Sequence, residues 1–182
     1  MNLLEVLIKK VDKAQLWSKS ITLSRKEYLT VKGTIDTNLY YIVSGSIRIY
    51  FEDEYEAQIL RLGYAGNFIG ALDSFMSSQP TSINIQALKK SEIKVLSKTD
   101  FDKYLENDSA NLLLWKQVLE LLVYQQMERE IDLLTYSPQK RYERVLQRSP
   151  QLFQEIPSKY IASYLRMSPE TLSRLKKNKK ML

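Results

Sequence analysis

The sequence predicts an α+β protein in which a β-sandwich or barrel is followed by an all-helical C-terminal part. Short runs rich in β-branched and aromatic residues lie between Ile21 and Phe101, and several of them alternate apolar and polar side chains. All five glycines of the 182-residue chain fall in this window, and turn residues separate the runs, as is typical of all-β folds. After Asp108 there is no glycine, and apolar residues recur at helical spacing.

These patterns place the elements in order. The chain should open with an amphipathic helix over residues 3–17. The predicted strands are 40–43, 47–51, 58–62, 83–87 and 93–96. A long helix should then cover 111–135. A basic helix over 138–148 should follow it and start at a Ser-Pro pair. We therefore expect a β domain with its N-terminal helix at 1–108, the long helix at 109–136 and a third region at 137–182.

The long helix carries more apolar surface than one partner could cover. Its apolar residues follow a three-four alternation close to a heptad stripe, and other apolar side chains lie off that stripe. At about 1.5 Å per residue the helix would run nearly 40 Å, longer than a small β domain can cover. We expect it to pack on the β domain and on a second copy of itself, with a dimerisation stripe at Trp115, Leu119, Leu122 and Met127. The alternative is that the whole stripe packs within its own domain.

The chain contains no cysteine and no histidine. This excludes disulfides, thiolate nucleophiles, Cys/His zinc sites, cysteine-held clusters and histidine acid–base catalysis. We predict no enzyme, no cofactor and no metal site. The N-terminus has an acid before its apolar run and lysines after it, the reverse of a signal peptide. No apolar stretch is long enough to cross a bilayer, so we expect a cytoplasmic protein without a membrane partner.

The basic charge is concentrated in the last quarter of the chain. Residues 138–182 hold eleven Lys and Arg against three Glu, a net charge of +8, whereas residues 1–137 hold 16 basic and 18 acidic residues. The whole chain carries +6. A basic region on an otherwise near-neutral chain indicates that this segment binds a polyanion.

Residues 156–177 have the pattern of a helix–turn–helix. The first helix, 158–165, would bury Ile161, Ala162 and Leu165, and Ser168 with Pro169 would start the second helix. The outer face of that helix would present its N-terminal residues to base edges and its basic residues to phosphates. The predicted DNA-binding residues are Ser168, Glu170, Thr171, Ser173, Arg174, Lys176 and Lys177. The alternative is a generic two-helix hairpin with a solvated basic surface.

Three motifs, in order and well separated, make the sequence similar to a known family. They are Leu-Tyr-Tyr-Ile-Val-Ser-Gly-Ser-Ile at 39–47, Gly-Asn-Phe-Ile-Gly at 66–70 and Ser-Pro-Glu-Thr-Leu-Ser-Arg at 168–174. Together they resemble the Crp/Fnr transcription regulators, the group that includes the cyclic-AMP receptor protein. The resemblance covers nearly the whole chain.

The resemblance implies a fold and a function. It implies an N-terminal cyclic-nucleotide-binding-type β-roll (a jelly roll), a long dimerisation helix and a C-terminal all-α helix-turn-helix domain. The implied partners are double-stranded DNA, a second copy of the chain and RNA polymerase. In this family the residues matching Glu170 and Arg174 contact bases, while Ser168 and Thr171 lie near the DNA backbone.

The chain departs from the family at the nucleotide pocket. Nucleotide-binding members carry a Glu for the ribose and an Arg for the cyclic phosphate, and here the matching positions are Ala71 and Thr81. A buried phosphate without its cation is costly, so we expect no cyclic-AMP response of the usual kind. An unidentified small-molecule effector could still be held there. The predicted pocket residues are Phe68, Ile69, Gly70, Ala71, Leu72, Thr81 and Ser82.

Two further departures concern the DNA-binding part. The family usually has Gly at the turn between the two helices, where φ is often positive, and this chain has Arg166. The family's β-wing after the second helix is not expected here, because the sequence ends at Leu182. We expect Lys176, Lys177, Lys179 and Lys180 to supply phosphate contacts in its place.

Another class of function fits part of the same pattern. In that interpretation the chain is a ligand-sensing or protein-interaction module whose basic C-terminal tail binds a different polyanion. The two hypotheses differ in whether Arg174 contributes to DNA sequence selectivity.

Overall fold

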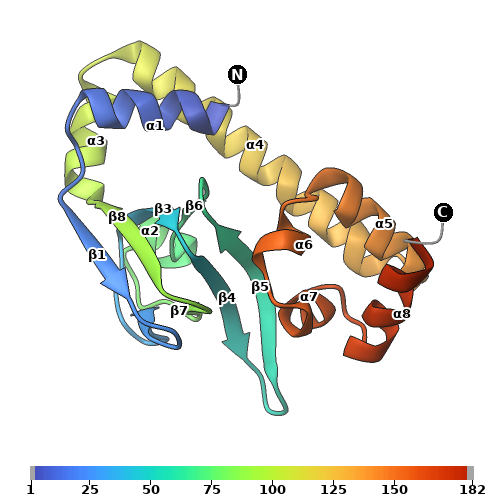
Figure 1. Ribbon diagram of the computed structural model, residues 1–182. Coiled ribbons are helices and arrows are strands. Elements are labelled where there is room, and N and C mark those ends of the chain that lie inside the picture. The colour runs from blue at the N-terminus through green and yellow to red at the C-terminus, as the bar shows by residue number, and fades with distance from the viewer. Residues whose placement is uncertain (1–2, 180–182) are drawn as a thin grey trace.

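The computed structural model describes residues 3–179. Its strands gather into one β domain, and its longest helix, α4 (Ser109–Leu134), runs from that domain to a group of helices at the C-terminal end (Figure 1). The chain is therefore a mixed α+β protein with antiparallel sheets, as the sequence predicts.

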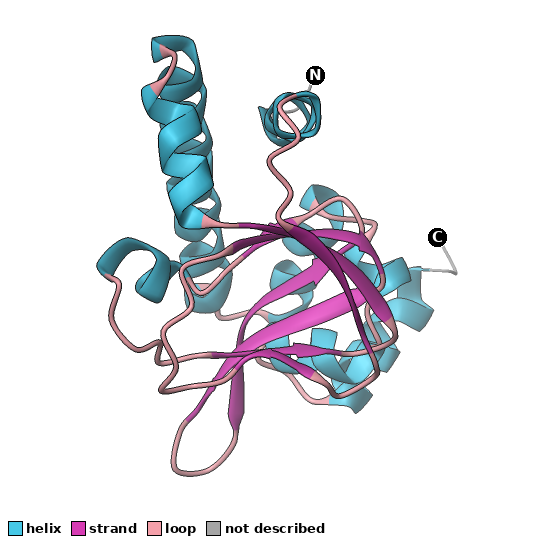
Figure 2. Cartoon of the chain, turned by 90° about the vertical axis from the view of Figure 1, so that its left-hand side faces the viewer, coloured by secondary structure: helices cyan, strands magenta, loops and turns pink. Residues whose placement is uncertain are grey.

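Eight strands form two four-stranded antiparallel sheets (Figure 2). One has the order β1-β8-β3-β6 and the other β2-β7-β4-β5. The strands are β1 (Lys19–Leu23), β2 (Tyr28–Thr30), β3 (Leu39–Ser44), β4 (Ser46–Glu52), β5 (Ala57–Tyr64), β6 (Phe68–Ile69), β7 (Asn84–Ala87) and β8 (Ser91–Leu96). All five strands predicted from alternation are present, because their inward side chains build the core between the sheets. That core includes Ile42, Ile47, Ile85 and Ile93, each at most 1% exposed.

The turn between β3 and β4 depends on a glycine. Gly45 has φ +100°, and a Cβ built there would lie 2.1 Å from Ser91 Oγ. Any other residue would be strained by its backbone and would collide with β8. The Ser91 hydroxyl accepts from the Ser46 amide at 3.1 Å, so this close approach joins the two sheets at the turn.

A second core lies where helices cover the β domain. Helix α1 (Leu3–Lys13), α3 (Lys98–Glu106) and the first half of α4 meet there around Leu7, Val11 and Phe101. Trp115 of α4 packs edge-on against the Phe101 ring, with centroids 5.0 Å apart. Helix α1 ends four residues earlier than predicted. The sequence patterns did not predict α3 or the short α2 (Leu72–Ser77).

The C-terminal helices have a core of their own, which also contacts the β domain. They are α5 (Pro138–Arg148), α6 (Leu152–Glu155), α7 (Ser158–Tyr164) and α8 (Pro169–Lys179). Helix α5 has the predicted bounds, and the Ser137 side chain accepts from the Lys140 amide at 3.3 Å as its cap. The sequence patterns did not predict α6; Leu152 is buried in this core, and its segment folds into that short helix.

The C-terminal helices dock on β5. The third core contains Leu62 and Tyr64 of β5 together with Ile161 of α7. Lys89, before β8, pairs with Glu155 of α6 at 2.9 Å. Figure 1 shows α6 and α7 beside β5, so the β domain, α4 and the C-terminal helices meet in one region.

Candidate functional site

Helices α7 and α8 form a tightly packed pair. Ile161 and Ala162 of α7, Leu165 at its end and Leu172 of α8 are each 0% exposed. The pattern predicted the burial of Ile161, Ala162 and Leu165 in the first of these helices. Met167, in the turn, packs partly against the same core. The pair thus holds α8 with one face buried and the other outward.

The turn between these helices is held by a buried arginine. Arg166 has φ +54°, a conformation that costs a non-glycine residue roughly 1 kcal/mol. Arg141 of α5, 8% exposed, donates to the carbonyl oxygens of Leu165 and Arg166, each at 2.9 Å. The same guanidinium donates to the carbonyl of Thr135 at 2.7 Å, so one side chain links the end of α4 to the turn.

Helix α8 starts as the sequence predicted. Ser168 Oγ accepts from the Thr171 amide at 3.2 Å, which is the geometry of an N-cap. The backbone amide of Glu170 and the Ser168 hydroxyl lower the pKa of the exposed Glu170 carboxyl, so it is ionised at neutral pH.

The predicted DNA-binding residues lie on α8, but not all are equally free. Glu170, Ser173, Arg174 and Lys177 are exposed, and Thr171 is half-buried. Lys176 turns back and donates to Ser158 Oγ at 2.7 Å, and burial lowers its pKa. The Lys180 position and the Lys179 side chain fall outside what the structure describes, so their expected contacts remain predictions.

The predicted ligand residues fall into two places. Phe68 and Ile69 form β6, and Gly70, Ala71 and Leu72 lead directly into α2. Thr81 and Ser82 lie further along the chain, where they face the first turn of α2. Between the two groups lies Asp73, which sequence reasoning missed.

The Asp73 carboxylate accepts four hydrogen bonds. It accepts from Thr81 Oγ1 and the Ser82 amide, each at 2.8 Å, from Ser82 Oγ at 3.0 Å, and from the Ser74 amide at 2.9 Å. Burial opposes the charged form, but these hydrogen bonds outweigh it and lower the pKa of Asp73. The protein's own carboxylate thus occupies a donor set suited to an external anion. The signal in the sequence was an acidic residue two positions after Ala71.

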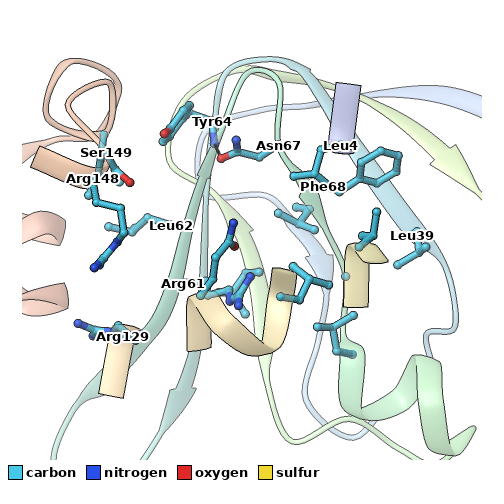
Figure 3. A pocket seen from close by; sticks show the side chains of 18 of the residues that line it. Leu4, Leu39, Arg61, Leu62, Tyr64, Asn67, Phe68, Arg129, Arg148 and Ser149 are labelled. Carbon is cyan, nitrogen blue, oxygen red and sulfur yellow. Dashed lines mark hydrogen bonds between the residues drawn. The ribbon is translucent and has the colours of Figure 1, made fainter. Parts of the chain in front are cut away.

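A cavity of about 380 Å³ lies where the β domain, α4 and the C-terminal helices meet (Figure 3). Of the seven predicted pocket residues, four line it, namely Phe68, Ile69, Gly70 and Leu72. Ala71, Thr81 and Ser82 are not in its wall. The cavity extends instead toward residues that were not predicted, including Arg61, Arg129 and Tyr164.

The predicted dimerisation residues divide between two faces of α4. Trp115 and Leu122 pack against the second core of their own chain, and Leu119 is half-buried. Met127 is 57% exposed. An exposed apolar stripe with three-four spacing runs through it, formed by Tyr124, Met127, Ile131 and Leu134.

Two other classes of site are absent from the described residues. Residues 3–179 contain no group of three or more acidic side chains placed to hold a metal ion. No helix in that range is long and apolar enough to cross a membrane.

Comparisons with known proteins agree with this architecture. Residues 20–108 match the family model described as the cyclic nucleotide-binding domain. A mutant of CooA from Carboxydothermus hydrogenoformans has a similar structure, with a TM-score of 0.73 and 22% identity over 100% of this chain and 85% of that chain. No curated protein sequence matches significantly.

Two further structures are similar over most of the chain. The catabolite activator protein of Thermus thermophilus is 20% identical, with a TM-score of 0.59, over 93% of this chain and 82% of that chain. CLP of Xanthomonas campestris, a c-di-GMP responsive global regulator, is 16% identical, with a TM-score of 0.66, over 96% and 92%.

Residues 20–108 thus resemble a cyclic nucleotide-binding domain, and a long helix and a helical C-terminal region follow them. All three structures are below 25% identity, so the likeness concerns the fold. The fold of this chain is therefore similar to that of CooA, the catabolite activator protein and CLP.

Proposed function

We propose that this chain is a sequence-specific DNA-binding transcription regulator of the Crp/Fnr type and that it acts as a dimer. In this proposal α7 and α8 are its helix-turn-helix, and α8 enters the major groove. The observation that supports it most directly is the outer face of α8. Glu170, Ser173 and Arg174 are exposed there, and Ser168 caps the start of the helix. A recognition helix presents its N-terminal residues in this way.

The roles of these side chains follow from their chemistry. Arg174 can donate two hydrogen bonds to guanine O6 and N7, and Glu170 can accept from cytosine N4. Ser168 and Thr171 lie at the start of the helix, where hydroxyls and amides meet phosphate oxygens. Lys177 is exposed for a phosphate contact. Lys176 reaches a phosphate only after leaving Ser158.

Selection of bound sites from random DNA, followed by fluorescence anisotropy on the selected site, tests the proposal. Arg174→Ala should weaken specific binding by about 1–3 kcal/mol and relax preference at one base pair. Lys177→Ala should weaken all sequences alike and reduce the salt dependence by about one phosphate contact. Arg25→Ala is the matched control, since Arg25 is exposed on the β domain.

The result separates two functions. Unchanged DNA selectivity in Arg174→Ala would contradict the proposal and favour a module that binds another polyanion through its basic end. Retention of the dimer in that variant, measured by light scattering, confirms that the loss is local.

The proposal includes the absence of a usual cyclic-AMP response. Ala71 and Thr81 offer no ribose acceptor and no cation, and Asp73 fills the donors beside them with a negative charge. A cyclic phosphate there would face like charge without compensation. Calorimetry with cyclic AMP, and with cyclic GMP as control, should detect no tight specific binding. Tight binding of cyclic AMP alone would overturn this part.

A further inference from the structure

The cavity beside α4 has an apolar end and a cationic end. Leu4, Leu39 and Phe68 lie at one end, and Arg129 and Arg148 lie at the other, with Arg61 between them (Figure 3). At about 380 Å³ it falls within the range of small-molecule sites. Its wall combines β5, α4, α5 and α7, so it belongs to both the β domain and the C-terminal helices.

Arg129 is a buried cation with unmet hydrogen-bonding capacity. Arg129 is only 7% exposed, and its Nη1 has no hydrogen-bond partner among residues 3–179. The guanidinium stacks 3.6 Å from the centre of the Tyr164 ring. Stacking satisfies the face of the group but none of its N–H donors.

Arg61 of β5 is a second cation in the same wall. Within the described chain it forms no hydrogen bond and no ion pair, and burial lowers its pKa. Its neighbour from the other domain is Tyr164, which also stacks with Arg129. Two desolvated arginines therefore line the same cavity as this tyrosine.

The nearby carboxylates are already engaged by other arginines. Asp132 and Glu128 of α4 pair with Arg144 and Arg148 of α5. Asp132 favours the charged form of Arg129 through space, whereas Arg166 and Arg148 oppose it. The charge at this end of the cavity is thus positive, and burying unpaired cations is costly unless an anion completes the site.

We propose that this cavity binds a small organic anion, with Arg61 and Arg129 holding a phosphate or carboxylate group and the leucines and Phe68 holding an apolar body. Planar guanidinium groups suit both anions because they donate two parallel hydrogen bonds. The site is separate from the turn that Asp73 fills, and it does not depend on α8 or on DNA.

The position of the site gives the ligand a regulatory role, which rests on the proposed function. A ligand in this cavity contacts Arg61 of β5, Arg129 of α4 and Tyr164 of α7. The relative positions of these three elements determine the orientation of α8. Ligand binding stabilises the docked arrangement of β5 and α7 by mass action. DNA affinity and ligand affinity must then change each other by the same factor.

Titration calorimetry on the full chain tests the site with phenyl phosphate and benzoate as anionic probes. Inorganic phosphate and phenol are the controls, because each carries only the anionic or only the aromatic part of a probe. One molecule of phenyl phosphate or benzoate should bind per chain, more tightly than either control. The better of the two probes identifies the anionic group. Failure of both to bind at millimolar concentration would overturn the proposal.

Substitutions locate the binding. Arg61→Gln and Arg129→Gln should each weaken binding of the probe by tenfold or more, whereas Arg25→Gln, a matched loss of one exposed charge, should leave it unchanged. Equal weakening in all three would indicate nonspecific charge attraction and contradict the site. In hydrogen exchange, phenyl phosphate should protect β5 and α7; protection confined to α8 would place the anion on the DNA-binding face instead.

A second variant separates ligand binding from folding. Arg129→Met keeps an unbranched apolar stem and removes the uncompensated charge, so the unliganded variant should melt no lower than the wild type. Phenyl phosphate should no longer raise its melting temperature. A lower melting temperature with an unchanged ligand-induced increase would show that Arg129 is structural and overturn its assignment.

DNA binding measured in parallel distinguishes the two proposals. Loss of the anion site with retained operator binding is expected for Arg61→Gln. Absence of sequence-specific DNA binding in the wild type would overturn the proposed function and leave the anion site intact, since calorimetry needs no DNA.

Discussion

Arg141 of α5 holds the strained turn at Arg166: its Nη2 donates to the Arg166 carbonyl oxygen at 2.9 Å. Other donors of the same guanidinium reach the carbonyls of Leu165, Thr135 and Tyr136. The buried guanidinium of Arg141 therefore donates to four backbone carbonyl oxygens. Two of them follow the end of α4, and two belong to the turn before α8. The orientation of α8 relative to α4 depends on this guanidinium.

Arg141→Lys should therefore destabilise the C-terminal helices although it keeps the charge. An ammonium group is a single point with three donors and cannot reach acceptors on both segments at once. We expect a loss of roughly 2–4 kcal/mol, seen as a lower melting temperature, together with weaker binding to the selected DNA site. Arg25→Lys is the matched control. An unchanged melting temperature would mean that water satisfies these carbonyls equally well.

Asp132 should be important for the junction between α4 and α5. Its side chain is 0% exposed, accepts from Arg144 Nε at 2.9 Å and also pairs with Arg148. Asp132→Asn leaves two arginines beside a neutral amide. Because those arginines are about one-third exposed, water offsets part of the loss, and we expect roughly 2–3 kcal/mol of destabilisation by denaturant unfolding. Lys116→Gln, which breaks an exposed pair with Glu120, should change stability by less than about 0.5 kcal/mol.

Asp73 predicts a specific pH dependence. Hydrogen bonds lower its pKa below the ordinary value of 3.8, so its contribution is present above that value and is lost as pH falls through the folded-state pKa. Asp73→Asn should reduce stability by about 1–3 kcal/mol at pH 7. The difference from the wild type should shrink as the pH falls below about 4, as measured by thermal melting. A difference that is independent of pH would assign the effect to packing.

The sequence could predict what depends on local patterns. Short β-rich runs, several of them alternating apolar and polar side chains, predicted five of the strands. The Ser137-Pro138 pair predicted the start of α5. The motif at 168–174 placed the start of α8. The roles of Arg61 and Arg129 could not be predicted, because the residues beside them in the cavity are remote in the sequence. The partners of Asp73 lie within nine residues, but the loop that brings them to its carboxylate has no periodic pattern. Tyr164 stacks on Arg129 from a different helix, and no periodicity encodes that contact. Helix α6 was missed because four residues carry no measurable period.

The division of α4 into two faces predicts opposite effects for two substitutions. Trp115 packs on Phe101 and Phe75 within its own chain, whereas Ile131 is 45% exposed on the stripe that includes Met127. Trp115→Ala should therefore lower the free energy of unfolding by about 3 kcal/mol through a cavity. Ile131→Glu should instead place like charges at the seam between two copies and shift the protein toward the monomer.

Light scattering and thermal melting together decide between these roles. The wild type should have the mass of a dimer at micromolar concentration, and Ile131→Glu should have half that mass with intact secondary structure. Leu60→Glu, which alters an exposed residue of β5, is the control and should remain a dimer. A monomeric wild type would contradict the proposed seam. A dimer that survives Ile131→Glu but not Trp115→Ala would return the seam to the stripe of Trp115, Leu119 and Leu122.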